Sequence, residues 1–324
     1  MLMVKVAIVG AGLSGLAAAG VLKEHGIEAV LLDKGRSPGG RLATRRIEDG
    51  RADHGAQFFT VRTSELREAA GKWLEKGWIK EWYADPHPRY IGTEGMNSLA
   101  KRLAENFDVR VNSRVVKVKE KGTGFAVQLD SGETVEAEAV LLTMPAPQTL
   151  ELLNASGIEE DSGLSAIQFN PCFAALAVLT EPLKLENGHL DRGLPENVER
   201  IAEQSAKGIS KEPIAVVYMK GEWSKEHFEE EEAAVLSAIL HSAEKVIPEN
   251  KVKAVQLKRW RYAEAAELVN RPFLSIGESG LLLAAGDAFL RTDDPAGRSR
   301  FESAYLSGLA AGEELALKLK NAAK

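Results

Sequence analysis

The sequence predicts an α/β fold, in which a Rossmann-like nucleotide-binding domain carries an inserted α+β domain built on an antiparallel sheet. Residues 4–34 have the pattern of an apolar strand, a glycine turn, an Ala- and Leu-rich helix and a second strand ending in an acid. Between residues 109 and 143 the hydrophobic period changes to two and leads into a strand that is apolar on both faces. A second apolar run, 281–285, precedes Gly-Asp and a terminal helix. We therefore expect one domain to be built from both ends of the chain.

The glycine turn follows the pattern G-x-G-x-x-G. The first glycine permits a tight turn, the second lets a pyrophosphate approach the backbone, and the third lets helix and strand pack closely. The free N–H groups at the helix start can then bind phosphate. The predicted contacts in this turn are Gly10, Gly12, Leu13, Ser14 and Gly15.

The second strand ends in Asp33, which Lys34 follows. In a dinucleotide-binding unit an acid about 20 residues after the turn accepts hydrogen bonds from the adenosine ribose. Because strand, helix, second strand and acid all fall at the required spacing, a dinucleotide site is favoured over a plain βαβ unit. We therefore include Asp33 and Lys34 among the predicted cofactor contacts.

The composition is that of an ordinary soluble globular protein, with 324 residues, 44% of them hydrophobic and 27% charged. A net charge of −6, a pI near 5.7 and scattered Lys and Arg argue against a nucleic-acid or anionic-membrane partner. No apolar run is long enough to span a membrane, and residues 1–9 continue into the glycine turn as a core strand rather than a signal peptide. The single cysteine, Cys172, cannot form an internal disulfide and is expected to fill space. We expect a cytoplasmic protein.

The middle of the chain predicts a separate antiparallel sheet with helical cover. Its expected strands are 165–180, 213–219 and 252–262, with one long helix over 224–246. Upstream, we expect a helix over 64–76 with Ser64 as N-cap, a loop rich in proline and aromatic residues, and a helix over 97–106. The predicted nucleotide-binding domain comprises 1–60, 97–160 and 273–324, and the predicted substrate domain comprises 61–96 and 161–272.

Two segments after the first βαβ unit indicate a flavoprotein. One is the loop that contains Gly39-Gly40-Arg41, and the other is the polar segment 52–59. A plain nicotinamide-binding domain would continue directly into further βα units. Both segments instead look like a chain that runs back along an extended FAD.

With these segments, the chain resembles the FAD-dependent amine oxidase superfamily and, within it, the renalase family and its bacterial relatives. The resemblance implies an FAD-binding domain of the glutathione-reductase type and a small-molecule substrate. It rests on segments in family order over nearly the whole chain: Gly39–Arg41, Asp53–Phe58, Arg89–Gly92, Gly95-Met96, Leu141–Pro147, Glu222–Ser224, Lys258–Ala263, Gly286-Asp287 and Arg300–Glu302.

The resemblance also implies roles for single residues around FAD. The double-glycine loop would place Arg41 on a phosphate or the ribityl chain, and Asp287 would hold the ribityl or pyrophosphate group. The backbone N–H groups of Arg300 and Phe301 would face the flavin N1–C2 edge, where a helix N-terminus stabilises the negative charge of reduced flavin. The implied contacts beyond the glycine turn are Gly40, Arg41, Gln57, Phe58, Val115, Gly286, Asp287, Arg300 and Phe301.

The reaction implied by the family is the transfer of a hydride from a 2- or 6-dihydro isomer of NAD(P) to flavin N5, with O2 reduced to hydrogen peroxide. A dihydronicotinamide is already a good hydride donor, so orientation supplies most of the catalysis. The lack of a Ser/His/Asp triad is therefore no objection. The six histidines are dispersed, and we expect no metal site.

The sequence departs from the family where the substrate is expected. Tyr218 stands where relatives carry a histidine, and Gln204 lies in a stretch that also differs. A tyrosine can donate one hydrogen bond but is no cation near neutral pH. We expect Tyr218, Gln57 and Trp260 at the catalytic site, while ordinary core packing stays open for each.

Two other functions remain open from the sequence alone. One is a flavin-containing amine oxidase or a desaturase-like oxidoreductase on the same fold. Amine oxidases of this superfamily usually present a lysine near flavin N5, and no lysine can be placed there from the sequence. The other is a noncatalytic nucleotide-binding regulator, against which the intact glycine and Gly-Asp motifs count.

Overall fold

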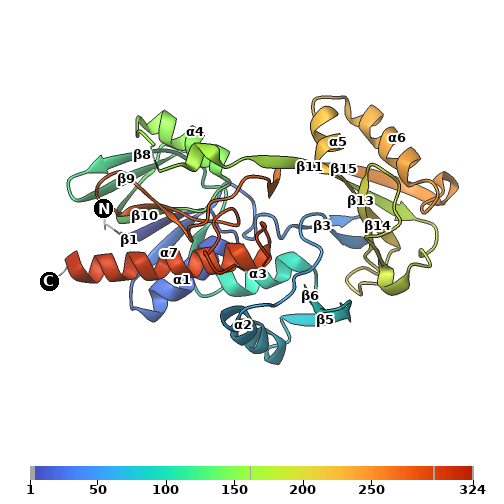
Figure 1. Cartoon of the computed structure of the whole chain (residues 1–324), viewed down its shortest axis with the longest axis horizontal. Coiled ribbons are helices and arrows are strands. Elements are labelled where there is room, and N and C mark those ends of the chain that lie inside the picture. The colour runs from blue at the N-terminus through green and yellow to red at the C-terminus, as the bar shows by residue number, and fades with distance from the viewer. Residues whose placement is uncertain (1–3, 161, 295, 323–324) are drawn as a thin grey trace.

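The structure is a computed structural model that describes residues 4–160, 162–294 and 296–322. The ends of the expected domains at residues 1–3, 161 and 323–324 lie outside the described residues. Two sheets occupy opposite ends of an elongated molecule, and both chain ends lie beside the larger one (Figure 1). The fold is mixed α/β with a Rossmann-like domain, as the sequence predicts.

The larger sheet has eight strands in the order β16-β17-β10-β1-β2-β7, and β9 joins β8 to β10. The central strand β1 pairs in parallel with β2 and β10, and β10 pairs in parallel with β17. These strands are apolar on both faces because one face packs on helices and the other on a second core that includes Phe125 and Leu153. The strands are β1 Val4–Val9, β2 Ala29–Leu32, β7 Asp108–Arg110, β8 Val115–Lys121, β9 Gly124–Leu129, β10 Thr134–Leu142, β16 Leu274–Ile276 and β17 Leu282–Ala284.

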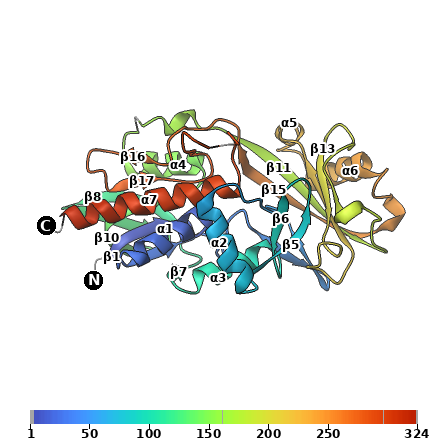
Figure 2. The same ribbon diagram turned by 60° about the horizontal axis from the view of Figure 1, so that its bottom comes forward.

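Helices from both ends of the chain pack on this sheet. The last helix, α7 (Phe301–Ala322), lies along α1 (Leu13–Glu24), as Figure 2 shows. The contact is close because a Cβ at Gly308 would lie 2.2 Å from the Ser14 carbonyl oxygen. The other helices of this part are α2 Ser64–Glu75, α3 Met96–Ala104 and α4 Ala146–Ser156.

The smaller sheet has five antiparallel strands in the order β12-β13-β14-β11-β15. One face packs on α5 (Gly221–Glu226) and α6 (Glu232–Ala243). The other face packs on a hairpin from the N-terminal part, β3 (Thr44–Ile47) and β4 (Gly50–Asp53), and so joins the two parts of the chain. The strands are β11 Phe169–Leu179, β12 His189–Leu190, β13 Val198–Glu203, β14 Ile214–Met219 and β15 Val252–Ala265.

The structure corrects three local predictions. The expected helix 224–246 is two helices, because residues 227–231 leave the helical path and Arg259 donates to the Phe228 and Glu230 carbonyls at 2.6 and 2.7 Å. The expected loop after α2 contains a hairpin, β5 (Ile79–Ala84) and β6 (Pro88–Gly92). The N-cap of α2 is Thr63 rather than Ser64.

The predicted domain boundaries stay a prediction. Leu66 and Trp73 of α2 and Ile79 of β5 belong to the same hydrophobic core as Ile8 and Leu16. The segment 61–96 therefore packs against the nucleotide-binding part as well as leading toward the smaller sheet.

Candidate functional site

The glycine turn between β1 and α1 has the shape that a dinucleotide requires. Gly10 has φ +108°, and a Cβ there would lie 2.6 Å from the Thr143 Oγ1. A Cβ at Gly15 would lie 2.2 Å from the Gly10 carbonyl oxygen, so helix and strand touch at this position. A Cβ at Gly12 would meet no heavy atom within 4 Å. The protein itself thus fills the space beside Gly10 and Gly15, whereas the space beside Gly12 is open.

The N-terminus of α1 is suited to an anion. It begins after Gly12, no side chain caps it, and its first turn contains no acidic residue. The hydroxyl of Ser14 is buried and has no hydrogen-bond partner among the described residues. A pyrophosphate would satisfy both this hydroxyl and the free N–H groups near Leu13. The residues present therefore fit the predicted cofactor.

Asp33 lies at the end of β2 beside the glycine turn. Its Oδ2 accepts the Ala11 N–H at 2.7 Å, and its Oδ1 accepts the Gly35 N–H at 2.7 Å. The backbone that leads into β8 passes close by, because the Ser113 N–H donates to the Asp33 carbonyl at 2.8 Å, two residues before Val115. Lys34 is exposed, and its Nζ donates to the Gln148 Oε1 at 3.0 Å, so it points toward α4.

The double-glycine loop and the late Gly-Asp turn meet through one ion pair. The Nη1 and Nη2 of Arg41 lie 2.8 and 2.5 Å from the Asp287 carboxylate oxygens. The loop also contacts the glycine turn, because a Cβ at Gly40 would lie 3.6 Å from the Gly12 Cα. Beside Asp287, the Gly286 N–H donates to the Ser307 Oγ of α7 at 2.9 Å. Positions far apart in the sequence thus surround the N-terminus of α1.

The start of α7 meets the polar segment 52–59. Phe301 stacks on Phe59 with ring centroids 4.1 Å apart and an interplanar angle of 10°. The Arg300 N–H donates to the Ser303 Oγ at 2.9 Å, so binding to a flavin edge would require this hydrogen bond to be exchanged. The predicted role of Arg300 stays a prediction.

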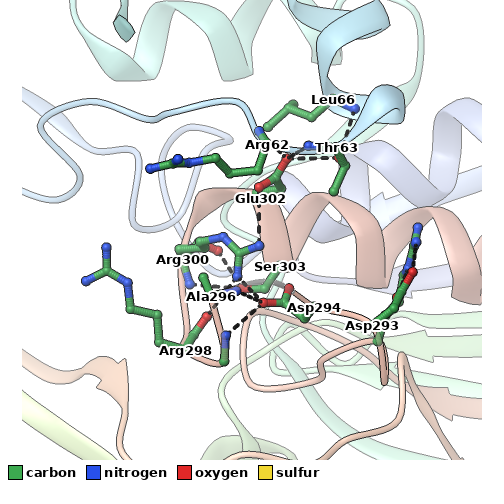
Figure 3. A network of polar contacts seen from close by, with 12 residues as sticks. Arg62, Thr63, Leu66, Asp293, Asp294, Ala296, Arg298, Arg300, Glu302 and Ser303 are labelled. Atoms are coloured by element: carbon green, nitrogen blue, oxygen red, sulfur yellow. Dashed lines mark hydrogen bonds and ion pairs between the residues drawn. The ribbon is translucent and has the colours of Figure 1, made fainter. Parts of the chain in front are cut away.

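The Arg300 side chain is fixed by two buried carboxylates (Figure 3). Its Nη1 lies 2.7 Å from the Asp294 Oδ1, and its Nη2 lies 3.2 Å from the Glu302 Oε2. The other oxygen of Glu302 accepts the Arg62 and Thr63 N–H groups at 3.0 and 2.8 Å, which joins the start of α7 to the start of α2. This network, which the sequence did not reveal, holds the helix start in place.

Gln57 is buried and all four hydrogen-bonding positions of its amide are occupied. Its Nε2 donates to the Asp53 carbonyl at 2.5 Å and to the Tyr218 hydroxyl. Its Oε1 accepts from the Gln204 Nε2 at 3.1 Å and from the Lys207 Nζ at 3.0 Å. The Gln57 amide therefore has no donor or acceptor left for a ligand in this arrangement, and it acts by holding the side chains that it bonds to.

The other two predicted catalytic residues contact the same segment from the smaller sheet. Tyr218, on β14, is 6% exposed, and its hydroxyl lies 2.9 Å from the Gly55 carbonyl, to which it can donate. Burial raises the pKa of Tyr218 well above its ordinary value, so the phenol stays neutral. Trp260, on β15, donates from Nε1 to the His54 carbonyl at 2.7 Å and stacks on the imidazole of His54. Tyr218 and Trp260 thus both bond to the backbone of the segment 52–59, which contains Gln57.

Cationic and aromatic groups surround Phe58. The guanidinium carbon of Arg89 lies 4.5 Å from the Phe58 ring centroid, and that of Arg200 lies 5.9 Å away. Arg89 is buried and pairs with Asp191 at 3.2 Å. Burial and the nearby Arg200 lower the pKa of His189, which packs edge-on against Phe58, to about 4. Arg89 was noted only as part of a family segment, and Arg200 and His189 were not predicted, because nothing in the local sequence marks these residues as neighbours of Phe58.

Comparisons with known proteins agree with this geometry. The profile of the NAD(P)-binding Rossmann-like domain matches residues 8–72. The profile of the flavin containing amine oxidoreductase family matches residues 78–315, well over half of the chain. The chain belongs to the flavin-containing amine oxidoreductase family. It is therefore an FAD-dependent oxidoreductase that acts on a small molecule, which favours an enzyme over a noncatalytic regulator.

Individual relatives cover nearly the whole chain. Renalase from Mus musculus is 24% identical over 327 residues, which cover 90% of this chain and 94% of that protein. A triple mutant of putrescine oxidase has a TM-score of 0.69 at 16% identity and covers 96% of this chain and 98% of its own. Wild-type putrescine oxidase bound to putrescine has a TM-score of 0.65 at 16% identity, with the same coverage. The structural likenesses concern the fold alone. The family match and the sequence similarity to renalase confirm the predicted renalase-like membership of the amine oxidase superfamily, and the shared fold agrees with it.

Within the part of the chain that the structure describes, no helix combines the length and apolar character needed to cross a membrane.

Proposed function

We propose that this enzyme oxidises a dihydronicotinamide isomer, 2- or 6-dihydro-NAD(P), to NAD(P)+. Bound FAD would supply the hydride acceptor, and O2 would take up the electrons, so that substrate, O2 and one proton give NAD(P)+ and hydrogen peroxide. The sequence similarity to a renalase over 90% of the chain supports this class of oxidase. The substrate itself is argued below from the charges around Phe58.

The observation that carries the proposal is the positive charge beside Phe58. Arg89 and Lys207 are each paired with a carboxylate, at 3.2 and 2.6 Å. Arg200 contacts only the carboxylate of its chain neighbour Glu199, at 4.0 Å, among the ion pairs of the described residues. Arg200 is therefore the most loosely paired of the three cations and the one best able to bind a phosphate of a dinucleotide. An ammonium substrate would find each of these carboxylates already facing a cation.

The chain's own residues need only bind and orient such a substrate. Phe58 is partly exposed and lies beside Arg89 and Arg200, so that a nicotinamide ring would contact an aromatic side chain there. Gln57, Tyr218 and Trp260 form the wall of the site and keep its shape, since their polar groups bond to the protein. No proton transfer by a side chain is required, because the reduced nicotinamide is already a hydride donor.

The test is anaerobic stopped-flow mixing of the FAD-loaded enzyme with 2-dihydro-NAD, 6-dihydro-NAD, ordinary NADH and putrescine. We expect rapid loss of flavin absorbance with 6-dihydro-NAD and slow or no loss with putrescine. Reduction by putrescine but not by either dihydro isomer would reject the proposal. Admission of O2 should then restore the yellow colour and release one hydrogen peroxide per substrate.

A charge variant sharpens the test. Arg200→Met should weaken binding of 6-dihydro-NAD about 10-fold, which corresponds to one lost charge-assisted contact. The matched control is Arg261→Met, because Arg261 is exposed and pairs with Glu229 at 3.0 Å on the helical side of the smaller sheet. Equal affinities in the two variants would show that Arg200 does not select the substrate.

A further inference from the structure

A fully buried lysine lies behind Gln57. Lys207 follows β13 and is 2% exposed. Its Nζ lies 2.6 Å from the Asp53 Oδ2, 3.0 Å from the Gln57 Oε1 and 5.5 Å from the ring centroid of Trp82. Lys207 comes from the inserted part of the chain, whereas Asp53 and Gln57 come from the N-terminal part. The contact therefore joins the smaller sheet to the predicted flavin segment.

Lys207 is not the sole partner of the Asp53 charge. The Asp53 Oδ1 accepts the Met96 N–H at the first turn of α3, at 2.9 Å, and the Thr44 hydroxyl. A helix N-terminus stabilises a carboxylate in this position. The bond from Lys207 to Gln57 is therefore a contact that charge compensation alone does not explain.

This bond fixes which way the Gln57 amide points. An ammonium group has three donors and no acceptor, so it can face only the oxygen of the amide. The Gln204 side chain reinforces this choice, because its Oε1 accepts the Asp53 N–H at 3.0 Å and leaves its Nε2 to donate to Gln57. The Nε2 of Gln57 must then point to the Asp53 carbonyl and the Tyr218 hydroxyl. A reversed amide would set one NH2 group against two donors.

We propose that Lys207 is a positioning residue for the segment 53–58: its ammonium group orients the Gln57 amide, which in turn orients the Tyr218 hydroxyl and holds Phe58 at the flavin. The proposal rests on the proposed function and on the predicted placement of Gln57 and Phe58 beside FAD. It assigns to a lysine a role that needs no contact with flavin N5.

The experiment compares three variants of the full-length, FAD-loaded protein. Lys207→Met alone leaves the Asp53 carboxylate with one partner fewer and is expected to fold poorly or lose FAD. Lys207→Met combined with Asp53→Asn removes both charges, and Lys207→Gln with Asp53→Asn restores a donor to the Gln57 oxygen. The matched control is Lys211→Met, since Lys211 is exposed four residues further on.

The readouts are FAD content, the flavin absorption spectrum, the flavin reduction potential, and the rate constant and Kd for anaerobic reduction by 6-dihydro-NAD. We expect the Met/Asn double variant to retain FAD but to show a displaced flavin band and a reduction rate constant lowered about 10-fold, with Kd changed less than about threefold. The Gln/Asn double variant should recover the spectrum and most of the rate. The control should match the wild type.

A Met/Asn double variant with wild-type spectrum, potential and rate would overturn the proposal and leave Lys207 as a charge partner only. Failure of the Gln/Asn variant to differ from the Met/Asn variant would overturn it as well. The spectrum and potential do not depend on the substrate. If 6-dihydro-NAD fails to reduce even the wild type, the proposed function falls, while these two readouts still decide the role of Lys207.

Discussion

Two alanine substitutions in the glycine turn should affect different properties of the protein. Gly15→Ala should lower the stability of the fold, whereas Gly12→Ala should weaken FAD binding. Gly15→Ala places a methyl group 2.2 Å from the Gly10 carbonyl oxygen, a backbone atom that cannot rotate away. Overpacking typically costs about 1–3 kcal/mol of unfolding free energy, and a clash with a backbone atom belongs at the upper end of that range. Gly12→Ala meets no protein atom within 4 Å, and Gly12 has an ordinary extended conformation with φ −76° and ψ −178°. We expect its apoprotein to lose less than about 1 kcal/mol, the usual cost of alanine at an N-cap.

The affinity for FAD should be lowered by Gly12→Ala, the substitution that leaves the stability nearly unchanged. The methyl group of Gly12→Ala would occupy the space through which a pyrophosphate reaches the N-terminus of α1, so we expect the Kd for FAD to rise at least about 10-fold. Urea unfolding of the deflavinated proteins measures the first effect, and titration of the apoproteins with FAD measures the second. A Gly12→Ala protein that binds FAD with wild-type affinity would refute the placement of the pyrophosphate. A Gly15→Ala apoprotein of wild-type stability would refute the packing argument.

Three further predictions concern single side chains. Asp33→Ala removes the acceptor of the Ala11 and Gly35 N–H groups and should raise the Kd for FAD about 10-fold; unchanged FAD content after purification would argue against a ribose contact. Tyr218→Phe should lower the unfolding free energy by about 1–2 kcal/mol in urea titrations, since one buried hydroxyl partner is lost. It should change the flavin reduction rate less than about threefold, and a larger loss would show that the hydroxyl takes part in the reaction, by substrate contact or through its bond to Gln57. The pKa of His189 is lowered from 6.5 to about 4 in the folded state, so the unfolded chain binds the proton more readily and stability is lost as pH falls from 6.5 toward 4. His189→Asn should remove on the order of 3 kcal/mol of this pH dependence, and identical pH profiles of the two proteins in urea unfolding would contradict it.

The sequence predicts those parts of the fold whose signals are local. The turn from Gly10 to Gly15 and the apolar strands around it carry their own pattern, because each strand is buried on both faces. The hairpin β5-β6 was missed because its prolines and aromatic residues resemble a loop. The break at residues 227–231 was missed because the acidic run has good helix propensity, while the carbonyls there are satisfied by Arg259 from a distant strand.

The candidate site depends on contacts that a local pattern does not contain. Arg41 and Asp287 were both predicted to bind the cofactor, but their mutual ion pair joins positions 246 residues apart. Lys207 lies in a polar stretch, where a lysine is ordinarily exposed, and only the tertiary structure shows it to be buried. Its partner Asp53 belongs to a segment identified by resemblance, yet no local pattern indicates which cation this carboxylate pairs with.

The contact between α1 and α7 has a consequence for synthesis of the protein. Ser14 and Ala18 of α1 pack against Gly308 and Gly312, so the first helix lacks its neighbour until about 290 further residues have been synthesised. Domains usually fold in order as they emerge, N-terminal first. Here the nascent β1-α1-β2 unit lacks its packing partner α7 during synthesis, so its apolar surface stays exposed and prone to aggregation until α7 has formed. We therefore expect FAD to bind only after α7 is available, and pulse-labelling of ribosome-bound chains should detect no flavin before release.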